Sequence, residues 1–157
     1  MTKKVYLGGT CNGSTWREKL IPQLKMACFN PVVADWSERH QIEEVKQRAE
    51  CDFLLYVISP LMSGVYSIAE AVDDSNKHPS KTVFCVLPTD ENKEGERFLF
   101  SVAQIKSLSA VGTMIKANGG IWLVEFKEIA PFLNSQIGNN TQSLLLVLAS
   151  KVISNHG

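Results

Sequence analysis

Residues 53–74, FLLYVISPLMSGVYSIAEAVDD, predict a strand, a turn and a helix in immediate succession. The uninterrupted apolar run Phe53–Ile58 is typical of a central strand that is buried on both faces of a parallel sheet. Ser59-Pro60 and Ser63-Gly64 then indicate a turn, and a helical pattern follows over about residues 65–76. Ligands of open α/β proteins bind at the carboxyl ends of parallel strands, so this stretch indicates both a fold class and the place of a site.

Four more apolar segments have the length of short strands, and helical patterns separate them. The expected strands are Val5–Leu7, Asn30–Ala34, Thr82–Leu87 and Ile121–Val124, and the expected helices cover about residues 15–28, 41–50, 98–117, 127–133 and 141–154. Such alternation favours a parallel sheet with right-handed crossovers. We therefore expect a flavodoxin- or Rossmann-like, doubly wound α/β fold. It has five parallel strands in the order 2-1-3-4-5 and helices on both faces, and residues 1–157 form one domain.

The composition is that of an ordinary globular protein. Sixteen Lys and Arg residues balance sixteen Asp and Glu residues, so the overall charge favours neither nucleic acid nor a membrane as a partner. The four cysteines contain no Cys-x-x-Cys pair, which argues against a zinc site and a disulfide framework. We expect no metal and no cofactor. No apolar run approaches about 18 residues and the N-terminus leads directly into a strand, so we expect a cytoplasmic protein.

Glu70 is the single carboxylate on the otherwise apolar face of the helix that begins near Val65. A buried carboxylate costs free energy unless it caps, pairs or reacts. Beside a sugar, such a glutamate can attack an anomeric carbon as the nucleophile of a retaining glycosyl transfer. We interpret Glu70 as catalytic, with structural hydrogen bonding as the alternative. Asp73 or Asp74 could raise its pKa from one turn away, although a solvated helix end is the simpler reading of both.

The loop Gly8–Ser14 should lie beside the segment Ser59–Glu70, because the switch point of the expected strand order falls between the first and third strands. Its glycines allow backbone N–H groups to approach a ligand. The loop is neither GxGxxG nor a Walker A sequence, which argues against a dinucleotide dehydrogenase and an ATPase. Tyr6 in the first strand could reach Glu70, with a core tyrosine whose hydroxyl is satisfied as the alternative. Arg17 could pair with a phosphate or with Asp35, with a surface arginine as the alternative.

At these residues the chain resembles the nucleoside 2-deoxyribosyltransferase superfamily, in particular its deoxyribosyltransferase-like branch. The resemblance covers roughly the first 90 residues and depends on the order and spacing of several degenerate motifs. These are Lys4–Gly9, Trp16-Arg17, Asn30–Trp36, Cys51–Ile58 and Val65–Ala71.

The resemblance implies that Glu70 attacks C1′ of a 2′-deoxynucleoside, and that a second base or water resolves the deoxyribosyl-enzyme. Tyr6 would orient Glu70, and Asp35 is, by position, the candidate for protonating or gripping the base. Gly64 stands where transferases of the family often carry an aspartate. Ser63 or Ser67 with Arg17 would suit a 5′-monophosphate, so nucleoside and nucleotide both stay open. The expected substrate-binding residues are Gly8, Gly9, Thr10, Asn12, Arg17, Trp36, Ser63, Gly64, Tyr66 and Ser67.

Members of the family are homo-oligomers in which a neighbouring subunit completes the pocket. The Leu-rich segment Leu144–Leu148 is a plausible contact, and Asn139 and Asn140 could be donated across it; burial within one subunit is the alternative. Two other functions stay open at this point. One is a TIR-like NAD glycohydrolase, which also places a glutamate on a helix after a buried strand. The other is a nucleotide-sensing module that keeps the scaffold without the catalysis.

Overall fold

The computed structural model describes residues 2–11 and 13–138. Its strands are β1 (Lys4–Gly9), β2 (Ala27–Phe29), β3 (Phe53–Ile58), β4 (Thr82–Val86), β5 (Thr89–Glu91), β6 (Arg97–Leu99) and β7 (Ile121–Leu123). Its α-helices are α1 (Trp16–Leu20), α2 (Glu38–Glu50), α3 (Tyr66–Lys77), α4 (Val102–Ala117) and α5 (Ile129–Ser135). Short 3-10 turns cover Ile21–Gln23, Pro79–Lys81 and Phe126–Glu128.

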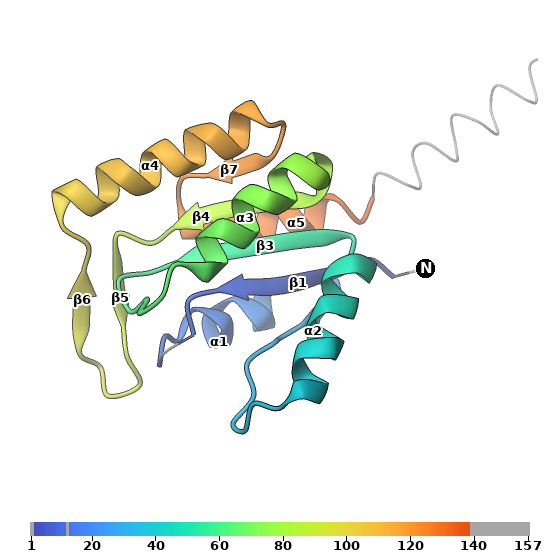
Figure 1. Cartoon of the computed structure of the whole chain (residues 1–157), viewed down its shortest axis with the longest axis horizontal. Helices are drawn as coiled ribbons and strands as arrows, with labels where there is room; N and C mark the ends of the chain where they lie inside the picture. The colour runs from blue at the N-terminus through green and yellow to red at the C-terminus, as the bar shows by residue number, and fades with distance from the viewer. Residues whose placement is uncertain (1, 12, 139–157) are drawn as a thin grey trace, which may run out of the picture.

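Five strands form one parallel sheet in the order β2-β1-β3-β4-β7. This order confirms the predicted doubly wound topology, with β7 as the fifth strand. Strand β1 lies between β2 and β3, so the chain reverses its direction of winding there. The loops after β1 and β3 therefore leave the same edge of the sheet side by side (Figure 1).

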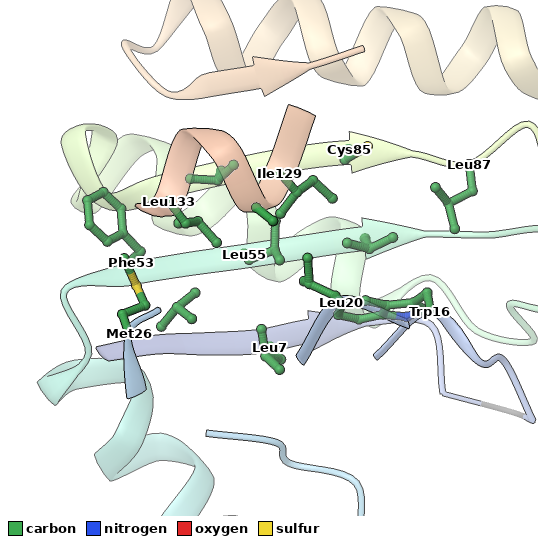
Figure 2. Close-up of a cluster of buried hydrophobic side chains, with 14 residues drawn as sticks. Leu7, Trp16, Leu20, Met26, Phe53, Leu55, Cys85, Leu87, Ile129 and Leu133 are labelled. Carbon is green, nitrogen blue, oxygen red and sulfur yellow. The ribbon is translucent and has the colours of Figure 1, made fainter. Parts of the chain in front are cut away.

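Alternate residues of the strands point to opposite faces and enter two separate cores. On one face, Leu7, Leu55 and Cys85 pack with residues of α1 and α5, as Figure 2 shows. On the other face, Tyr6, Tyr56 and Phe84 pack with residues of α3 and α4. Burial on both faces explains why the central strands read as continuous apolar runs.

The predicted second strand over residues 30–34 is wrong. The strand is Ala27–Phe29, which pairs with β1 from Lys4↔Ala27 to Tyr6↔Phe29, and Val32 and Val33 lie in an exposed loop. The helix predicted over residues 15–28 ends early, at Leu20, because a proline follows. Pro22 lies in the 3-10 turn that follows α1, and a proline inside an α-helix clashes with the preceding turn.

The helix predicted over residues 98–117 begins only at Val102. Ser101 caps it, because the side-chain oxygen accepts a hydrogen bond from the Gln104 N–H at 3.2 Å and the Gln104 side chain reaches back. The residues before the cap form β6, which pairs antiparallel with β5 in a hairpin beside the sheet (Figure 1). The helix predicted over residues 141–154 lies outside the described residues. Within residues 2–11 and 13–138, every helix is too short or too polar to span a bilayer.

Candidate functional site

Three adjoining cavities follow the carboxyl ends of β1 and β3, and together we call them the Glu70 cleft. The middle cavity, of about 230 Å³, contains Glu70 and shares Gly9, Tyr66 and Ser67 with an outer cavity of about 160 Å³. It also shares Trp36, Glu44, Tyr66 and Glu70 with an inner cavity of about 210 Å³. Glu70 thus borders two of the three compartments.

The two loops that the sequence places at this edge do meet there. Gly9 has φ +112°, and a Cβ at this position would lie 2.0 Å from the carbonyl oxygen of Val57, so only glycine lets β1 end against β3. Beyond it, the Thr10 Oγ1 accepts a hydrogen bond from the Ser59 N–H at 2.9 Å. This bond connects the loop after β1 to the loop after β3, and both loops line the cleft.

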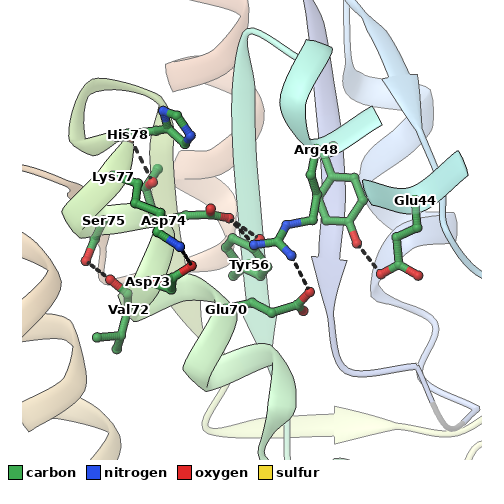
Figure 3. A network of polar contacts seen from close by, with 12 residues as sticks. Glu44, Arg48, Tyr56, Glu70, Val72, Asp73, Asp74, Ser75, Lys77 and His78 are labelled. Atoms are coloured by element: carbon green, nitrogen blue, oxygen red, sulfur yellow. Dashed lines mark hydrogen bonds and ion pairs between the residues drawn. The ribbon is translucent and has the colours of Figure 1, made fainter. Parts of the chain in front are cut away.

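Glu70 is 8% exposed and lies one turn into α3. Arg48 of α2 donates from Nη1 to Glu70 Oε1 at 2.8 Å and from Nη2 to Asp74 Oδ2 at 2.9 Å (Figure 3). The Tyr56 hydroxyl of β3 donates to the same Asp74 oxygen at 2.5 Å. Among the described residues no hydrogen bond occupies Glu70 Oε2. One carboxylate oxygen is therefore held by the protein and the other is available to a ligand.

Burial raises the pKa of Glu70 to about 7, and the charge of Arg48 opposes this rise. The nearby charges of Glu44 and Asp74 raise the pKa further. A carboxyl group with a pKa near neutrality can exist as a nucleophilic carboxylate or as an acid in the working range of most enzymes.

Tyr6 lines the cleft, but its hydroxyl does not donate to Glu70 as the sequence suggested. It donates to Glu44 Oε1 at 2.7 Å. Burial raises the pKa of Tyr6, and the hydrogen bond to Glu44 raises it further, so the phenol stays protonated. The group that holds Glu70 is Arg48.

Arg17 also lines the middle cavity, and it is only 5% exposed. Its guanidinium donates to three backbone carbonyls at the end of β1: Leu7 at 2.9 and 3.0 Å, Thr10 at 2.7 Å and Gly9 at 3.3 Å. The described residues form no ion pair with it, neither at Asp35 nor elsewhere, and burial lowers its pKa. Most of its donors are therefore engaged in holding the backbone that borders the cleft.

The other expected site residues divide into three groups. Gly8, Trp36, Tyr66 and Ser67 line the middle cavity, and Thr10, Ser63 and Gly64 line the outer one. Asp35 is exposed and borders neither of the cavities that contain Glu70. Asn12 lies outside the described residues, as do Asn139, Asn140 and Leu144–Leu148.

The sequence interpretation missed Glu44, Arg48 and Tyr56. Glu44 and Arg48 are four residues apart on α2, so they share one side of that helix, and both line the inner cavity. The sequence shows this spacing, but it does not show that Arg48 contacts α3. No group of three or more His, Cys, Asp or Glu side chains in the described residues could hold a metal ion.

A family model described as "Nucleoside 2-deoxyribosyltransferase like" matches residues 2–89, which is more than half of the chain. The matched segment contains every residue that lines the Glu70 cleft. Searches of curated proteins and of solved structures gave no significant match.

Proposed function

Because the chain belongs to the nucleoside 2-deoxyribosyltransferase-like family, we propose that it cleaves or exchanges the N-glycosidic bond of a 2′-deoxynucleoside or its 5′-monophosphate. The observation that carries this proposal is the state of Glu70. Its side chain is buried in a cleft, one oxygen is fixed by Arg48, and Oε2 accepts no hydrogen bond from the described residues. A fixed carboxylate with one available oxygen suits nucleophilic attack on a sugar carbon.

In the proposed first step, Glu70 Oε2 forms a bond to C1′ while the bond from C1′ to the base nitrogen breaks. The electron pair leaves with the base, which takes up a proton. In the second step the incoming base, or water, attacks C1′ and gives up a proton. The ester bond between C1′ and Oε2 then breaks, and its electron pair returns to Glu70. The sugar configuration at C1′ is retained, because it is inverted twice.

Glu44 is better placed than Asp35 to exchange this proton with the base. It lines both cavities that contain Glu70, and its Oε1 accepts the hydrogen bond of Tyr6. Trp36 and Tyr66, exposed by 65% and 74%, flank the same two cavities and offer aromatic faces to a base.

The outer cavity bears on the choice between nucleoside and monophosphate. Ser63, Gly64 and Ser67 line it where α3 begins. Hydroxyl groups and helix N–H groups are suitable partners for a 5′-hydroxyl or a 5′-phosphate. Matched pairs of deoxynucleosides and their monophosphates would separate the two. A much lower KM for the monophosphate indicates a nucleotide enzyme.

The direct test is incubation with deoxynucleosides or deoxynucleoside monophosphates, with and without a second free base, followed by chromatography of the bases. We expect Glu70→Ala to lower the rate at least ~10³-fold. Asp73→Asn is the matched control, because Asp73 is an exposed carboxylate on the same helix. An unchanged rate in Glu70→Ala contradicts the mechanism. Turnover of NAD alone supports the glycohydrolase alternative, and binding without turnover of any substrate supports the sensor.

We also propose that the protein acts as a homo-oligomer. Large apolar side chains remain exposed around the mouth of the cleft in the described residues, namely Val32, Val33, Trp36, Val45 and Tyr66. Association would remove them from water, which is favourable for contiguous apolar surface. Sedimentation velocity tests this directly, and a monomer at every protein concentration contradicts it.

A further inference from the structure

Arg48 connects two carboxylates that lie one turn apart on α3. Glu70 and Asp74 are 8% and 5% exposed, and the guanidinium reaches both from a different helix, α2. Its side chain is itself only 19% exposed. Charge-assisted hydrogen bonds of this kind are stronger and more directional than neutral ones. Arg48 therefore fixes the rotamer of Glu70 from outside the helix that carries it.

Asp74 differs from Glu70 in what it can reach. It borders neither the middle nor the inner cavity, so a ligand in the cleft meets Glu70 and not Asp74. Its Oδ2 accepts two hydrogen bonds, one from Arg48 and one from the hydroxyl of Tyr56, which is fully buried. Asp74 is thus anchored to the sheet through β3 and stays next to Arg48 whatever happens in the cleft.

The third nitrogen of the Arg48 guanidinium, Nε, indicates what determines where the guanidinium lies. Its Nε is buried and has no hydrogen-bond partner in the described part of the chain. A buried donor without a partner costs about 1–3 kcal/mol. The fold accepts this cost while both terminal nitrogens contact carboxylates, which indicates that the bridge between Glu70 and Asp74 determines where the guanidinium lies.

We propose that Arg48 is the positioning residue of this site: it holds Glu70 by Oε1 so that Oε2 faces C1′, and Asp74 remains its counter-ion while Glu70 is esterified. The catalytic half of this inference, that Arg48 orients Glu70 toward C1′, rests on the proposed function. The electrostatic half, that Arg48 and Asp74 set the ionisation of Glu70, concerns the protein without substrate.

The charge balance of the reaction explains why two carboxylates are needed. When Glu70 forms the ester to C1′, it loses its negative charge, and without Asp74 the largely enclosed Arg48 would be a cation with no counter-ion. Such a state is strongly unfavourable. Asp74 prevents it and keeps the guanidinium in place. When the ester bond breaks, the electron pair returns to Glu70, and the waiting Arg48 stabilises the carboxylate that is released.

Charged and titratable groups approach Glu70 from each element packed against it. They are Tyr6 of β1, Tyr56 of β3, Glu44 and Arg48 of α2, and Asp74 of α3 itself; Arg17 of α1 borders the same cavity. Arg48 is the cation that lowers the pKa of Glu70, and the carboxylates of Glu44 and Asp74 raise it. Removal of Arg48 and removal of the Asp74 charge must therefore change the ionisation of Glu70 in opposite directions.

The test is a pH titration of the Glu70 side-chain carboxyl by NMR, in the substrate-free protein labelled with ¹³C-glutamate. Relative to the parent, we expect Arg48→Met to raise the pKa of Glu70 by at least about one pH unit, and Arg48→Lys to restore most of the difference. Asp74→Asn should lower it. Lys77→Met is the matched control, because Lys77 is a cation of α3 that pairs with Asp73 in solvent, with both side chains more than half exposed. This control should leave the titration unchanged.

The pH dependence of kcat provides the catalytic readout. Its acid limb should move upward in Arg48→Met and return in Arg48→Lys, with a larger change in kcat than in KM. An unchanged Glu70 titration in folded Arg48→Met overturns the inference. If that variant does not fold, Arg48→Lys and Asp74→Asn provide the test. A pKa of Glu70 that does not change in Asp74→Asn also overturns the inference. A parent protein without turnover refutes the proposed function and the catalytic half, while the titrations still judge the electrostatic half.

Discussion

Two arginines border the Glu70 cleft, Arg17 buried and Arg48 partly exposed, and they bind different kinds of acceptor. Arg17 of α1 donates to the carbonyl oxygens of Leu7, Gly9 and Thr10, which are neutral at every pH. Arg48 of α2 donates to the carboxylates of Glu70 and Asp74, which can take up protons. The first arginine shapes the wall of the cleft, and the second sets the charge inside it. Two guanidinium groups in one site can therefore have roles that differ in their dependence on pH.

The largest effect on stability should come from Arg17→Met. Its removal leaves buried carbonyls at the end of β1 without these donors, and we expect the free energy of unfolding to fall by about 3 kcal/mol. The loss should be the same at about pH 5.5 and about pH 8, since the carbonyls do not titrate. Urea denaturation at both pH values measures it. Lys19→Met is the control, because Lys19 is exposed on the same helix. A loss confined to one pH would contradict the comparison.

Arg48→Met should cost less, about 2 kcal/mol at about pH 8, because protonation of Glu70 can relieve part of the loss. Here the loss must depend on pH. Without Arg48 the folded-state pKa of Glu70 rises further above its unfolded value. A carboxyl group whose pKa is raised by folding contributes stability at a pH below its unfolded-state pKa. It loses this contribution as the pH rises through its folded-state pKa.

The difference between Arg48→Met and the parent should therefore shrink from about pH 8 to about pH 5.5. The same urea series measures it, with the solvent-exposed Lys77→Met as the control. A loss of equal size at both pH values would make Arg48 a structural clamp of the same kind as Arg17.

The sequence predicted the sheet order and the position of Glu70 because both follow from local patterns. The run at β3 is apolar throughout and that at β4 is apolar after Thr82, which is typical of parallel strands buried on both faces. The second strand was misplaced because residues 27–29 and 32–34 are both short apolar runs. The choice between them depends on pairing with β1, which no local pattern contains.

The partners of Glu70 were beyond sequence reasoning for a similar reason. Arg48 and Glu70 are 22 residues apart and lie on two helices separated by a strand. Their contact depends on how α2 is rotated against α3, and a polar helix such as α2 gives little indication of its inner side. Tyr6 was assigned to Glu70 by proximity of the strands, whereas its hydroxyl donates to an acceptor on α2, Glu44.

Tyr56→Phe tests whether the anchor of Arg48 matters apart from Arg48 itself. The variant removes the 2.5 Å hydrogen bond to Asp74, and we expect a loss of about 1–2 kcal/mol because both groups are buried. Tyr6→Phe is the matched comparison. It removes a hydrogen bond to the partly exposed Glu44, which water can replace, so its loss should stay below about 1 kcal/mol. Thermal unfolding measures the loss in both variants, and a loss in Tyr56→Phe that is no larger than the loss in Tyr6→Phe would contradict this expectation.

Glu44→Gln should have the smallest effect and the most informative sign. Glutamine keeps an oxygen for the Tyr6 hydroxyl but removes a negative charge that raises the pKa of Glu70. We expect the pKa of Glu70 to fall by about half a pH unit, measured by the carboxyl titration of the substrate-free protein. Arg48, one turn further along α2, changes the same pKa in the opposite direction. A fall in Glu44→Gln together with a rise in Arg48→Met means that one side of α2 sets the ionisation of Glu70 by two opposed charges. No helix face that merely packs against α3 would produce this pair of results.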